Sequence, residues 1–536
     1  MEGKNELEKA KAGNIVPLYK TMSMTSCAVN YFTKISNYGR KKNSILLESA
    51  DVITKYGEKS IGSADPCLKV KGKENNFEIT SLNKTGKRFI NVIKNDFDFC
   101  ENLKISNEKI SGTIPKSKKV LNEEEKLFSK TYADVLRIIA FKLTPIYEPF
   151  EVYAGLFGAI AYDFIDQFEE LPKNKSDLLN EPDFEMNFYD NLFLLDHKKQ
   201  EITFVANALL FNETNKKKEL ERCEKIIENY EKALNEKTPI AKKSTNKKLS
   251  ISTDTKKEEF EKIVSRLQKN VLAGDIFQVV PSRTIISEYS SEPLNIYSEL
   301  RDLNPSPYMF FFNNSTGILL GSSPETFLKV SGKKQKKVEI RPIAGTKPRG
   351  IINGKIDLDL DSRFEAELKN DLKEMAEHTM LIDLARNDVA RVCKAGTRHC
   401  DKPYRIEKYS HVQHLVSNVS GELKSNYDAL HAYLASMNMG TLTGAPKVEA
   451  MKLIRQNEKT RRGFYGGSIG YLTPSKNFDS AIVIRSMSLQ NNKAYVRAGA
   501  GVVYDSIPEN EFFETEKKAK ACLKAISNAE AREWKK

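Results

Sequence analysis

The chain has 536 residues, of which 40% are hydrophobic and 29% charged, with seven cysteines and a formal net charge of +13. This length exceeds that of one typical domain, and the composition is that of a globular protein with a large core. No apolar run reaches the roughly 18 to 20 residues of a membrane span, and the first twenty residues lack an apolar segment, so we expect neither a membrane protein nor a secreted one. Scattered cysteines without a CxxC pair argue against a disulfide framework or a zinc finger and favour a cytoplasmic location.

The excess of basic residues first suggests nucleic acid as a partner. The lysines, however, lie mainly in short polar clusters typical of solvated loops, and neither an arginine-rich helix nor an RNP-type aromatic motif accompanies them. We therefore expect no nucleic-acid partner.

The N-terminal half, residues 1–235, is predicted to be rich in strands. Turn-bounded apolar runs at 44–53 and 202–211 predict strands, and the small residues of GLFGAIAYD at 155–163 indicate close backbone packing. A charged helical stretch at 216–236 closes this half. The polar, Lys/Ser/Thr-rich residues 236–256 that follow predict a surface connector.

The C-terminal half, residues 257–536, alternates predicted strands and helices between glycine-punctuated motifs, which indicates a mixed α/β or α+β class. It shows no repeat at 20–50 residues, so a solenoid or propeller is not expected. There is no Walker A loop, GxSxG elbow or HExxH helix, and Gly-Ala-Gly at 499–501 is too short for a dinucleotide fingerprint.

Residues 364–392 predict a helix, because apolar residues recur there at helical spacing. Glu374 and Glu377 are three residues apart and therefore share one face of that helix. Such a pair usually faces solvent. The same face continues into Leu381 and Leu384, however, which indicates a partly enclosed cleft, where a buried charge needs a cation or a hydrogen-bonding partner.

A second acidic pair repeats this spacing near the C-terminus. Ser506 and Glu509 predict a capping box at the start of a terminal helix, and Glu511 and Glu514 follow on one face together with Lys518. Two such pairs on separate helices could hold one Mg²⁺, which binds through one or two carboxylates together with waters and the substrate's own anion. The Glu-x-x-Glu spacing alone does not decide between this site and two solvated faces.

Several groups in the same half could hold an anionic ligand. Arg485 interrupts the apolar strand AIVIRSM, and the glycine turns at 345–346 and 499–501 let backbone N–H groups approach an anion. Tyr465 could offer its hydroxyl, and His414 is a candidate acid or base. Each also has a structural explanation, as an edge-strand arginine, a tight turn or a core side chain.

These residues lie in motifs that resemble those of the chorismate-utilising enzymes, specifically the large, aminating subunit (component I) of anthranilate synthase. The resemblance covers about residues 14–527, and MNMGTLTGAPK resembles the enteric bacterial form. It implies a two-lobed α+β fold, with large antiparallel-rich β-sheets stacked face to face and helices outside, an N-terminal lobe at 1–235 and a chorismate-binding lobe at 257–536. The motifs that carry it are LLESADV, GDIFQVVPSR, NPSPYMFF, RPIAGTKPRG, EHTMLIDLARNDVARVC, MNMGTLTGAPKVEAM, YGGSIGY and AGAGVVYDSIPENEFFETEKKA.

The resemblance implies Mg²⁺-dependent conversion of chorismate and ammonia to anthranilate and pyruvate, the first committed step of tryptophan biosynthesis. A separate glutaminase subunit (component II) would supply the ammonia, in a heterotetramer. By matching motif, Glu377 and Glu514 would be the principal Mg²⁺ ligands, with Glu374 and Glu511 acting directly or through water. His414 resembles the family's proposed general acid at the C4 hydroxyl, and Thr441 is another active-site match. The groups expected around chorismate are Gly345, Thr346, Tyr465, Arg485, Gly499, Ala500, Gly501 and Lys518.

Two positions separate the sister enzymes. In the isochorismate and salicylate synthases, a lysine that activates water matches Gln278, and a neutral amide is not a base. In aminodeoxychorismate synthase the PIAGT turn reads PIKGT, so Ala344 removes the nucleophilic lysine. Both residues favour anthranilate synthase, and the two sister activities are the alternatives.

The resemblance also implies feedback inhibition by L-tryptophan. The inhibitor would bind between the LLES segment of the N-terminal lobe and the PSPYM segment that follows the connector, and could couple two states of the protein. A buried strand and a proline turn would explain these segments equally well, apart from the interior Glu-Ser. The matching residues are Glu48, Ser49, Lys59, Pro307, Tyr308 and Met309.

Overall fold

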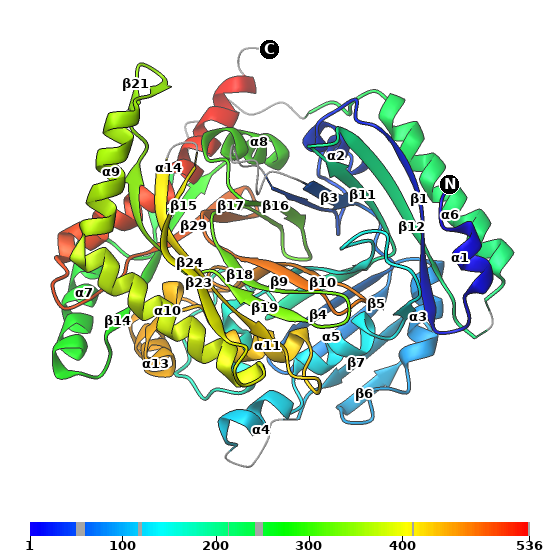
Figure 1. The fold of residues 1–536 in the computed structure, drawn as a ribbon, viewed down its shortest axis with the longest axis horizontal. Coiled ribbons are helices and arrows are strands. Elements are labelled where there is room, and N and C mark those ends of the chain that lie inside the picture. The colour runs from blue at the N-terminus through cyan, green and yellow to red at the C-terminus, as the bar shows by residue number, and fades with distance from the viewer. Residues whose placement is uncertain (50–58, 116–120, 213, 242–249, 410–411, 534–536) are drawn as a thin grey trace.

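Figure 1 shows the fold in a computed structural model, which describes residues 1–49, 59–115, 121–212, 214–241, 250–409 and 412–533. Two large β-sheets lie face to face, and helices cover their outer sides. This architecture confirms the predicted mixed fold with stacked, antiparallel-rich sheets. None of the helices in the described ranges is both long and apolar enough to span a lipid bilayer.

The first sheet has twelve strands and is antiparallel except at its edge, where β1 and β8 run parallel. In spatial order its strands are β13 (Ile251–Thr253), β15 (Ser282–Glu288), β29 (Lys493–Gly499), β28 (Ser486–Gln490), β17 (Ile318–Ser323), β16 (Tyr308–Asn313), β2 (Ile45–Glu48), β3 (Lys59–Ser63), β11 (Asn191–Asp196), β12 (Glu201–Leu209), β1 (Asn14–Ser23) and β8 (Thr144–Pro145).

The second sheet has thirteen strands, with β23 (His399–Lys408) pairing only with β24. The others are, in spatial order, β20 (Ile343–Pro348), β24 (Val412–Glu422), β19 (Lys337–Ile340), β18 (Thr326–Ser331), β27 (Phe478–Ile482), β26 (Ser468–Leu472), β9 (Gly155–Ile160), β10 (Phe184–Tyr189), β4 (Leu68–Lys73), β5 (Asn76–Ser81), β7 (Lys109–Thr113) and β6 (Glu101–Ile105). Two short pairs lie apart, β14 (Gln278–Val279) with β25 (Gly444–Ala445) and β21 (Ile351–Ile352) with β22 (Lys355–Ile356).

Apolar side chains fill three layers: one between the sheets, and one between each sheet and its helices. The first sheet packs on α2 (Ala28–Ile35), α6 (Lys216–Asn235), α8 (Pro293–Leu303) and α14 (Pro508–Glu533), and the second on α3 (Lys84–Ile93), α5 (Tyr132–Ala140), α10 (Leu372–Val392) and α11 (Ala429–Ser436). The other helices described are α1 (Lys4–Lys9), α4 (Glu123–Phe128), the 3₁₀ turn at Tyr162–Gln167, α7 (Lys257–Ala273), α9 (Leu358–Asn370), α12 (Gly440–Thr443) and α13 (Lys447–Asn457).

Both halves of the chain contribute strands to both sheets. In the first sheet they meet where β2 pairs with β16, and in the second where β9 pairs with β26. Gly155 and Gly158 of β9 lie at this second junction, where an added Cβ would stand only 2.3 Å from the carbonyl oxygen of Leu472 and 2.2 Å from that of Glu185. The predicted close backbone packing at GLFGAIAYD is therefore confirmed.

The strands predicted at 44–53 and 202–211 correspond to β2 and β12, and the helix at 216–236 corresponds to α6. Residues 50–53, and residues 242–249 of the predicted connector, lie outside the described residues. The last part of the connector forms β13 at the edge of the first sheet.

The single helix predicted over residues 364–392 is wrong. The structure has two helices, α9 and α10, that meet at Asp371. The backbone of Asp371 is extended, and its carboxylate accepts hydrogen bonds from the N–H groups of Lys373 and Glu374, so it caps a new helix. Leu372, which the pattern placed on the apolar stripe, is 86% exposed.

The predicted capping box at the start of the terminal helix is also not formed. Helix α14 begins at Pro508, and the Ser506 hydroxyl donates to Glu511 Oε1 at 2.8 Å. Glu509 pairs instead with Lys257 of α7, at 2.6 Å. The serine thereby orients a carboxylate of the predicted metal site.

Candidate active site

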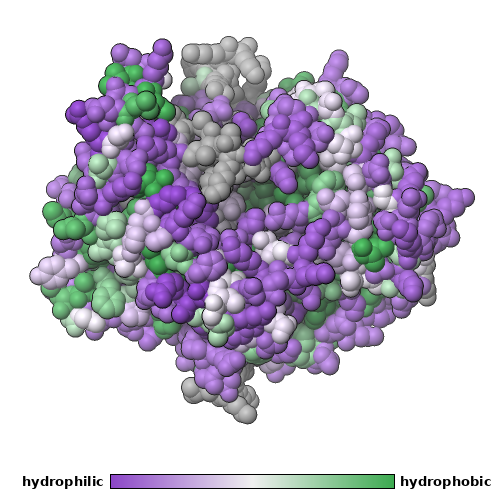
Figure 2. Space-filling view, in the orientation of Figure 1, coloured by the Kyte–Doolittle hydropathy of each residue, from purple (hydrophilic) through white to green (hydrophobic). Residues whose placement is uncertain are grey.

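The predicted site residues lie mainly on α10, α14, β14, β20 and β24, and of these elements α10, α14, β14 and β24 are labelled on the left side of Figure 1. In Figure 2 most of the surface is hydrophilic, and hydrophobic patches lie at the left edge, over α7 and around the β21–β22 hairpin. The site is thus bordered by exposed apolar groups.

The two acidic pairs, Glu374 with Glu377 on α10 and Glu511 with Glu514 on α14, lie near enough to influence one another's charge, and we call these four residues the acidic cluster. Burial raises the pKa of Glu374, and the nearby carboxylates of Glu377 and Glu514 raise it further. Burial likewise raises the pKa of Glu511, and Glu514 adds to this effect. Burial lowers the pKa of Lys518, whose charge is favoured by Glu514, Glu377 and Glu511. Carboxylates from α10 and α14 therefore act on one another and on one shared lysine.

The four glutamates do not together form a ready metal site, however. Within the described ranges, no three or more His, Cys, Asp or Glu side chains are arranged so that they could hold a metal ion together. The chemistry of the donors still fits Mg²⁺, which needs only one or two protein carboxylates when the substrate adds an anion. A divalent cation would also relieve the repulsion that raises the pKa of Glu374. Of the four glutamates, Glu377 and Glu514 remain the proposed direct ligands.

Two half-buried cations lie beside these carboxylates. Arg485 sits between β27 and β28 with a φ of 50°, a left-handed backbone that a non-glycine residue adopts at a cost, and its Nη1 donates to the Lys518 carbonyl at 3.3 Å. Lys518 Nζ donates to the Gly499 carbonyl at 2.9 Å and lies 3.6 Å from Glu514. Burial lowers the pKa of both cations, and the charge of Arg485 lowers the pKa of Lys518 further. An anionic ligand between them would be favoured.

The central N–H group of the turn at 499–501 is not available to bind an anion, but the turn leaves space for a neighbouring side chain. The Ala500 N–H donates to the Pro281 carbonyl at 3.1 Å, so it is not available to an anion. A Cβ on Gly501 would stand 2.6 Å from Gln278 Nε2. An alanine at this position would therefore displace the Gln278 amide.

Gln278 connects this turn to Glu377 of the acidic cluster. It is buried, its Nε2 donates to Glu377 Oε1 at 3.0 Å, and its Oε1 has no hydrogen-bond partner in the part of the chain that the structure describes. A buried acceptor without a partner costs free energy unless a ligand satisfies it. Oε1 is thus suited to accept a hydrogen bond from a small N–H or O–H donor.

His414 is neutral near pH 7 in this environment. Burial and Arg485 lower its pKa, although a hydrogen bond to the Gly345 carbonyl opposes them. Its Nδ1 lies 3.0 Å from that carbonyl and 3.1 Å from Thr346 Oγ1. Because a carbonyl can only accept, Nδ1 carries the proton and Nε2 is left as an acceptor.

Glu325 is a further candidate site residue, which the sequence motifs did not indicate. It follows the Ser-Ser-Pro of GSSPETF between β17 and β18 and is 5% exposed. Burial raises its pKa to about 8, against the influence of neighbouring Thr441 and of Lys518, so it is mostly protonated at neutral pH. Glu325 Oε1 and Thr441 Oγ1 are buried and lack hydrogen-bond partners among the described residues. The only signal in the sequence was an acidic residue in a short polar segment between two predicted apolar strands.

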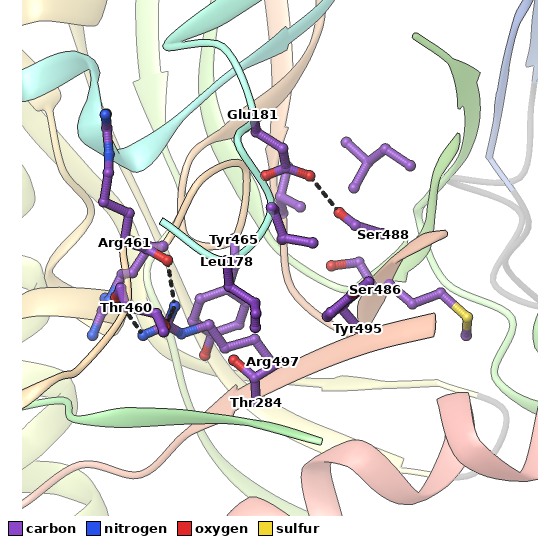
Figure 3. Close-up of a pocket in the computed structure, with 15 residues that line it drawn as sticks. Leu178, Glu181, Thr284, Thr460, Arg461, Tyr465, Ser486, Ser488, Tyr495 and Arg497 are labelled. Carbon is purple, nitrogen blue, oxygen red and sulfur yellow. Dashed lines mark hydrogen bonds between the residues drawn. The ribbon is translucent and has the colours of Figure 1, made fainter. Parts of the chain in front are cut away.

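Tyr465 stands in a rigid turn. The turn is fixed by hydrogen bonds from Phe464 N to Glu181 Oε2 and from Gly463 N to Asp163 Oδ2, both at 2.8 Å. Figure 3 shows Tyr465 in a small cavity, with Glu181 held by Ser488 on one side and Arg497 on the other. Two buried acids thus hold the backbone that presents the tyrosine.

The ionisation of Glu181 predicts how the stability of the fold depends on pH. Burial raises its pKa from 4.5 to about 7, so between these pH values the folded state binds more protons than the unfolded state and stability falls as pH rises. Glu181→Gln should therefore raise the free energy of unfolding at pH 8 by about 1–3 kcal/mol and change it little at pH 4.5. Thermal unfolding at the two pH values, with the exposed Glu228→Gln as control, measures this; an equal effect at both would contradict it.

The six predicted inhibitor residues lie on other elements than the acidic cluster, on or next to β2, β3 and β16. Met309 pairs with Glu48, and the Ser49 N–H donates to the Lys59 carbonyl at 3.2 Å. Glu48 is buried and accepts a hydrogen bond from Tyr297 Oη at 2.6 Å. Pro307 is buried directly before β16, and Tyr308 reaches the second sheet, where its hydroxyl bonds to Asp479 and Thr326.

Comparison with known proteins identifies the class. The family model of chorismate binding enzymes matches residues 101–524, and the chain belongs to that family. It is 42% identical, over 91% of its length and 94% of the relative's, to "Anthranilate synthase component 1" of Buchnera aphidicola subsp. Schizaphis graminum. The protein of the same name from Vibrio cholerae is 40% identical, over 91% of this chain and 92% of its own length.

A solved structure gives the same assignment. Anthranilate synthase component I from Streptococcus pneumoniae superposes with a TM-score of 0.67 at 28% identity, covering 88% of this chain and 94% of its own. The chain is therefore a chorismate-utilising enzyme, and it is similar throughout to the large subunits named anthranilate synthase component 1.

Proposed function

We propose that the chain converts chorismate and ammonia to anthranilate and pyruvate, as a Mg²⁺-dependent lyase at the start of tryptophan biosynthesis. The observation that carries this proposal is Gln278. A neutral amide stands where, by resemblance, the hydroxylating enzymes have a water-activating lysine, and its free Oε1 points to binding of an N–H donor. Ammonia carries its own lone pair and needs orientation rather than deprotonation.

Chorismate has two carboxylates, and the site offers a separate place for each. Arg485 and the Tyr465 hydroxyl would bind the enolpyruvyl carboxylate, while Glu377 and Glu514 would hold Mg²⁺ at the ring carboxylate. When bound there, the ion would neutralise that carboxylate and draw electrons from the ring. Lys518, next to Arg485, would add positive charge.

The 4-hydroxyl leaves as water when ammonia adds at C2, so a proton must be delivered to it. We assign this proton to Glu325, because burial keeps its carboxyl protonated at neutral pH and Thr441 lies beside it. His414, which resembles the family's proposed acid, is neutral, and its Nε2 is an acceptor, so it is suited to accept a hydrogen bond or a proton.

The alternatives are the two sister activities. Aminodeoxychorismate synthase would require a lysine at Ala344, and isochorismate or salicylate synthase a lysine at Gln278. Incubation with chorismate, Mg²⁺ and ammonium should produce anthranilate, detected by its fluorescence. Isochorismate, salicylate or aminodeoxychorismate as the released product would overturn the proposal.

A glutaminase subunit would supply the ammonia in the cell, in a cytoplasmic heterotetramer. The exposed apolar side chains beside the site support a protein partner there, since Phe277, adjacent to Gln278, is 73% exposed and Tyr504 is 69% exposed. Glutamine should therefore replace ammonium only when that subunit is added.

L-Tryptophan would inhibit from the group around β2 and β16. The contact that supports such coupling runs from Tyr308 through Thr326, which follows Glu325 directly in the chain. Ser49→Phe should relieve inhibition by tryptophan and leave ammonium-dependent turnover within about twofold, because Ser49 follows β2, whereas the acidic cluster lies on α10 and α14. Tryptophan inhibition curves for Ser49→Phe, and for the smaller substitution Ser49→Ala, measure this. An unchanged inhibition constant for Ser49→Phe would contradict the prediction.

A further inference from the structure

A buried ionic network lies behind Tyr465. Glu458 accepts hydrogen bonds from Arg462 Nη2 at 2.6 Å, from Arg497 Nη2 at 2.7 Å, and from both N and Oγ of Ser282 at 2.8 Å. All four residues are buried. Burial alone would raise the pKa of Glu458, but the two guanidinium groups hold it below its usual value. We call these four residues the Glu458 network.

The network touches the backbone of several segments that carry site residues. Arg462 donates to the carbonyls of Leu442, at 2.6 Å, and Val280, at 2.7 Å. Leu442 follows Thr441, and Val280 lies two residues after Gln278. Arg497 lies in β29, two residues before Gly499. One carboxylate therefore connects α12, the segment after β14, and β29.

The same arginines flank Tyr465. The Cζ atoms of Arg462 and Arg497 lie 5.8 Å and 6.0 Å from the centre of its ring. In Figure 3 Arg497 lies beside the tyrosine, fixed by hydrogen bonds to the Thr460 hydroxyl at 3.2 Å and the Arg461 carbonyl at 2.7 Å. Positive charge at this distance attracts the ring and polarises the phenol. Burial raises the pKa of Tyr465, and both arginines oppose this rise.

A buried ion pair often stabilises a core no more than apolar residues of similar volume would, because removing the charges from water costs free energy. Its planar, multiply bonded geometry does fix the relative orientation of the elements it joins. Here those elements are the ones that carry Thr441, Gln278 and the 499–501 turn, and the charge surrounds the tyrosine that faces the substrate.

We infer that the Glu458 network is a positioning device for the enolpyruvyl carboxylate of the substrate, acting through Tyr465. The arginines hold the ring in place and strengthen its hydroxyl as a hydrogen-bond donor to that carboxylate. This inference rests on the proposed function, which places Tyr465 at that group. Arg462, Arg497 and Glu458 are positioning residues, because they act on the substrate only through other groups.

Arg497→Lys tests the inference, because it keeps the charge and loses the planar fork. We expect KM for chorismate to rise by roughly tenfold, with kcat changed much less, since the lost interaction holds ground state and transition state alike. The double variant with Tyr465→Phe is decisive. In that background Arg497→Lys should raise KM by no more than about twofold, because the route through the phenol is already lost. Multiplicative effects of the two substitutions would overturn the inference.

Arg222→Lys is the matched control. Arg222 of α6 is paired with Asp190 and Glu219 and lies in the other half of the chain. The Arg222→Lys variant should have a lower unfolding temperature and an unchanged KM for chorismate.

If Arg497→Lys does not fold, Ser282→Ala is the second test, because it removes a smaller part of the network. It should also raise KM for chorismate, and again only when Tyr465 is present. An unchanged KM would contradict the inference. A wild-type protein that forms no anthranilate would refute the proposed function, whereas an active wild type with independent effects would refute only the role of the network.

Discussion

Replacement of Glu377 by glutamine is expected to reduce anthranilate formation with ammonium by about 10³-fold. The substitution keeps the shape of the side chain and an oxygen that can accept from Gln278, but removes the charge that a bound Mg²⁺ needs. A Lewis acid at the ring carboxylate is worth several kcal/mol, and each 1.4 kcal/mol is a factor of ten in rate.

The measurement is kcat as a function of Mg²⁺ concentration, together with Mg²⁺ binding by calorimetry. Asp383→Asn, at an exposed position of the same helix, is the control and should change neither. If Glu377→Gln bound Mg²⁺ with wild-type affinity, Glu377 would not be a ligand. Because three carboxylates are not arranged as a ready site among the described residues, we also expect Mg²⁺ to bind more tightly when chorismate is present.

The second large effect is expected for Glu325→Gln, with kcat lower by roughly 10²–10⁴-fold, the usual contribution of a positioned acid. The pH dependence gives the sharper test. Glu325 must be protonated to act, and its pKa is about 8, so wild-type kcat should fall as pH rises through that value. The residual activity of the variant should lack this fall, since an amide does not titrate.

Glu185→Gln is the matched control for Glu325. Glu185 is a buried carboxyl on β10 whose pKa burial also raises, but it bonds to Ser315, away from the site. Its replacement should leave both kcat and the shape of the pH profile intact. A Glu325→Gln variant with the same alkaline fall as the wild type would assign the acid to another residue.

Several elements of the fold could be predicted from the sequence because patterns of apolar and small residues carry local information, whereas the site residues stay predictions. Strand β2, helix α6 and the close packing of Gly158 followed from periodicity and residue size. The break between α9 and α10 could not be predicted, because the apolar spacing continues past Asp371. This residue caps a helix only when its backbone is extended. The chain pattern could not show that Leu372 is exposed.

The acid–base roles were the least predictable part. The pKa of Glu325 and that of His414 are set by burial between elements distant in the chain, which a linear pattern does not record. The Glu458 network could not be predicted from the sequence for the same reason. Ser282, Glu458 and Arg497 come from segments separated by up to about two hundred residues. Each of them alone is an ordinary polar residue.

The shared sheets have a consequence for biosynthesis. Strand β9 finds its neighbour β26 only after roughly 300 further residues have been made, which takes a ribosome about 15 to 60 s. During that time the nascent N-terminal half carries one open strand edge at β2 and another at β9, both apolar and available to other chains. Expression at low temperature or with a chaperone that binds exposed strands should therefore increase the yield of native protein.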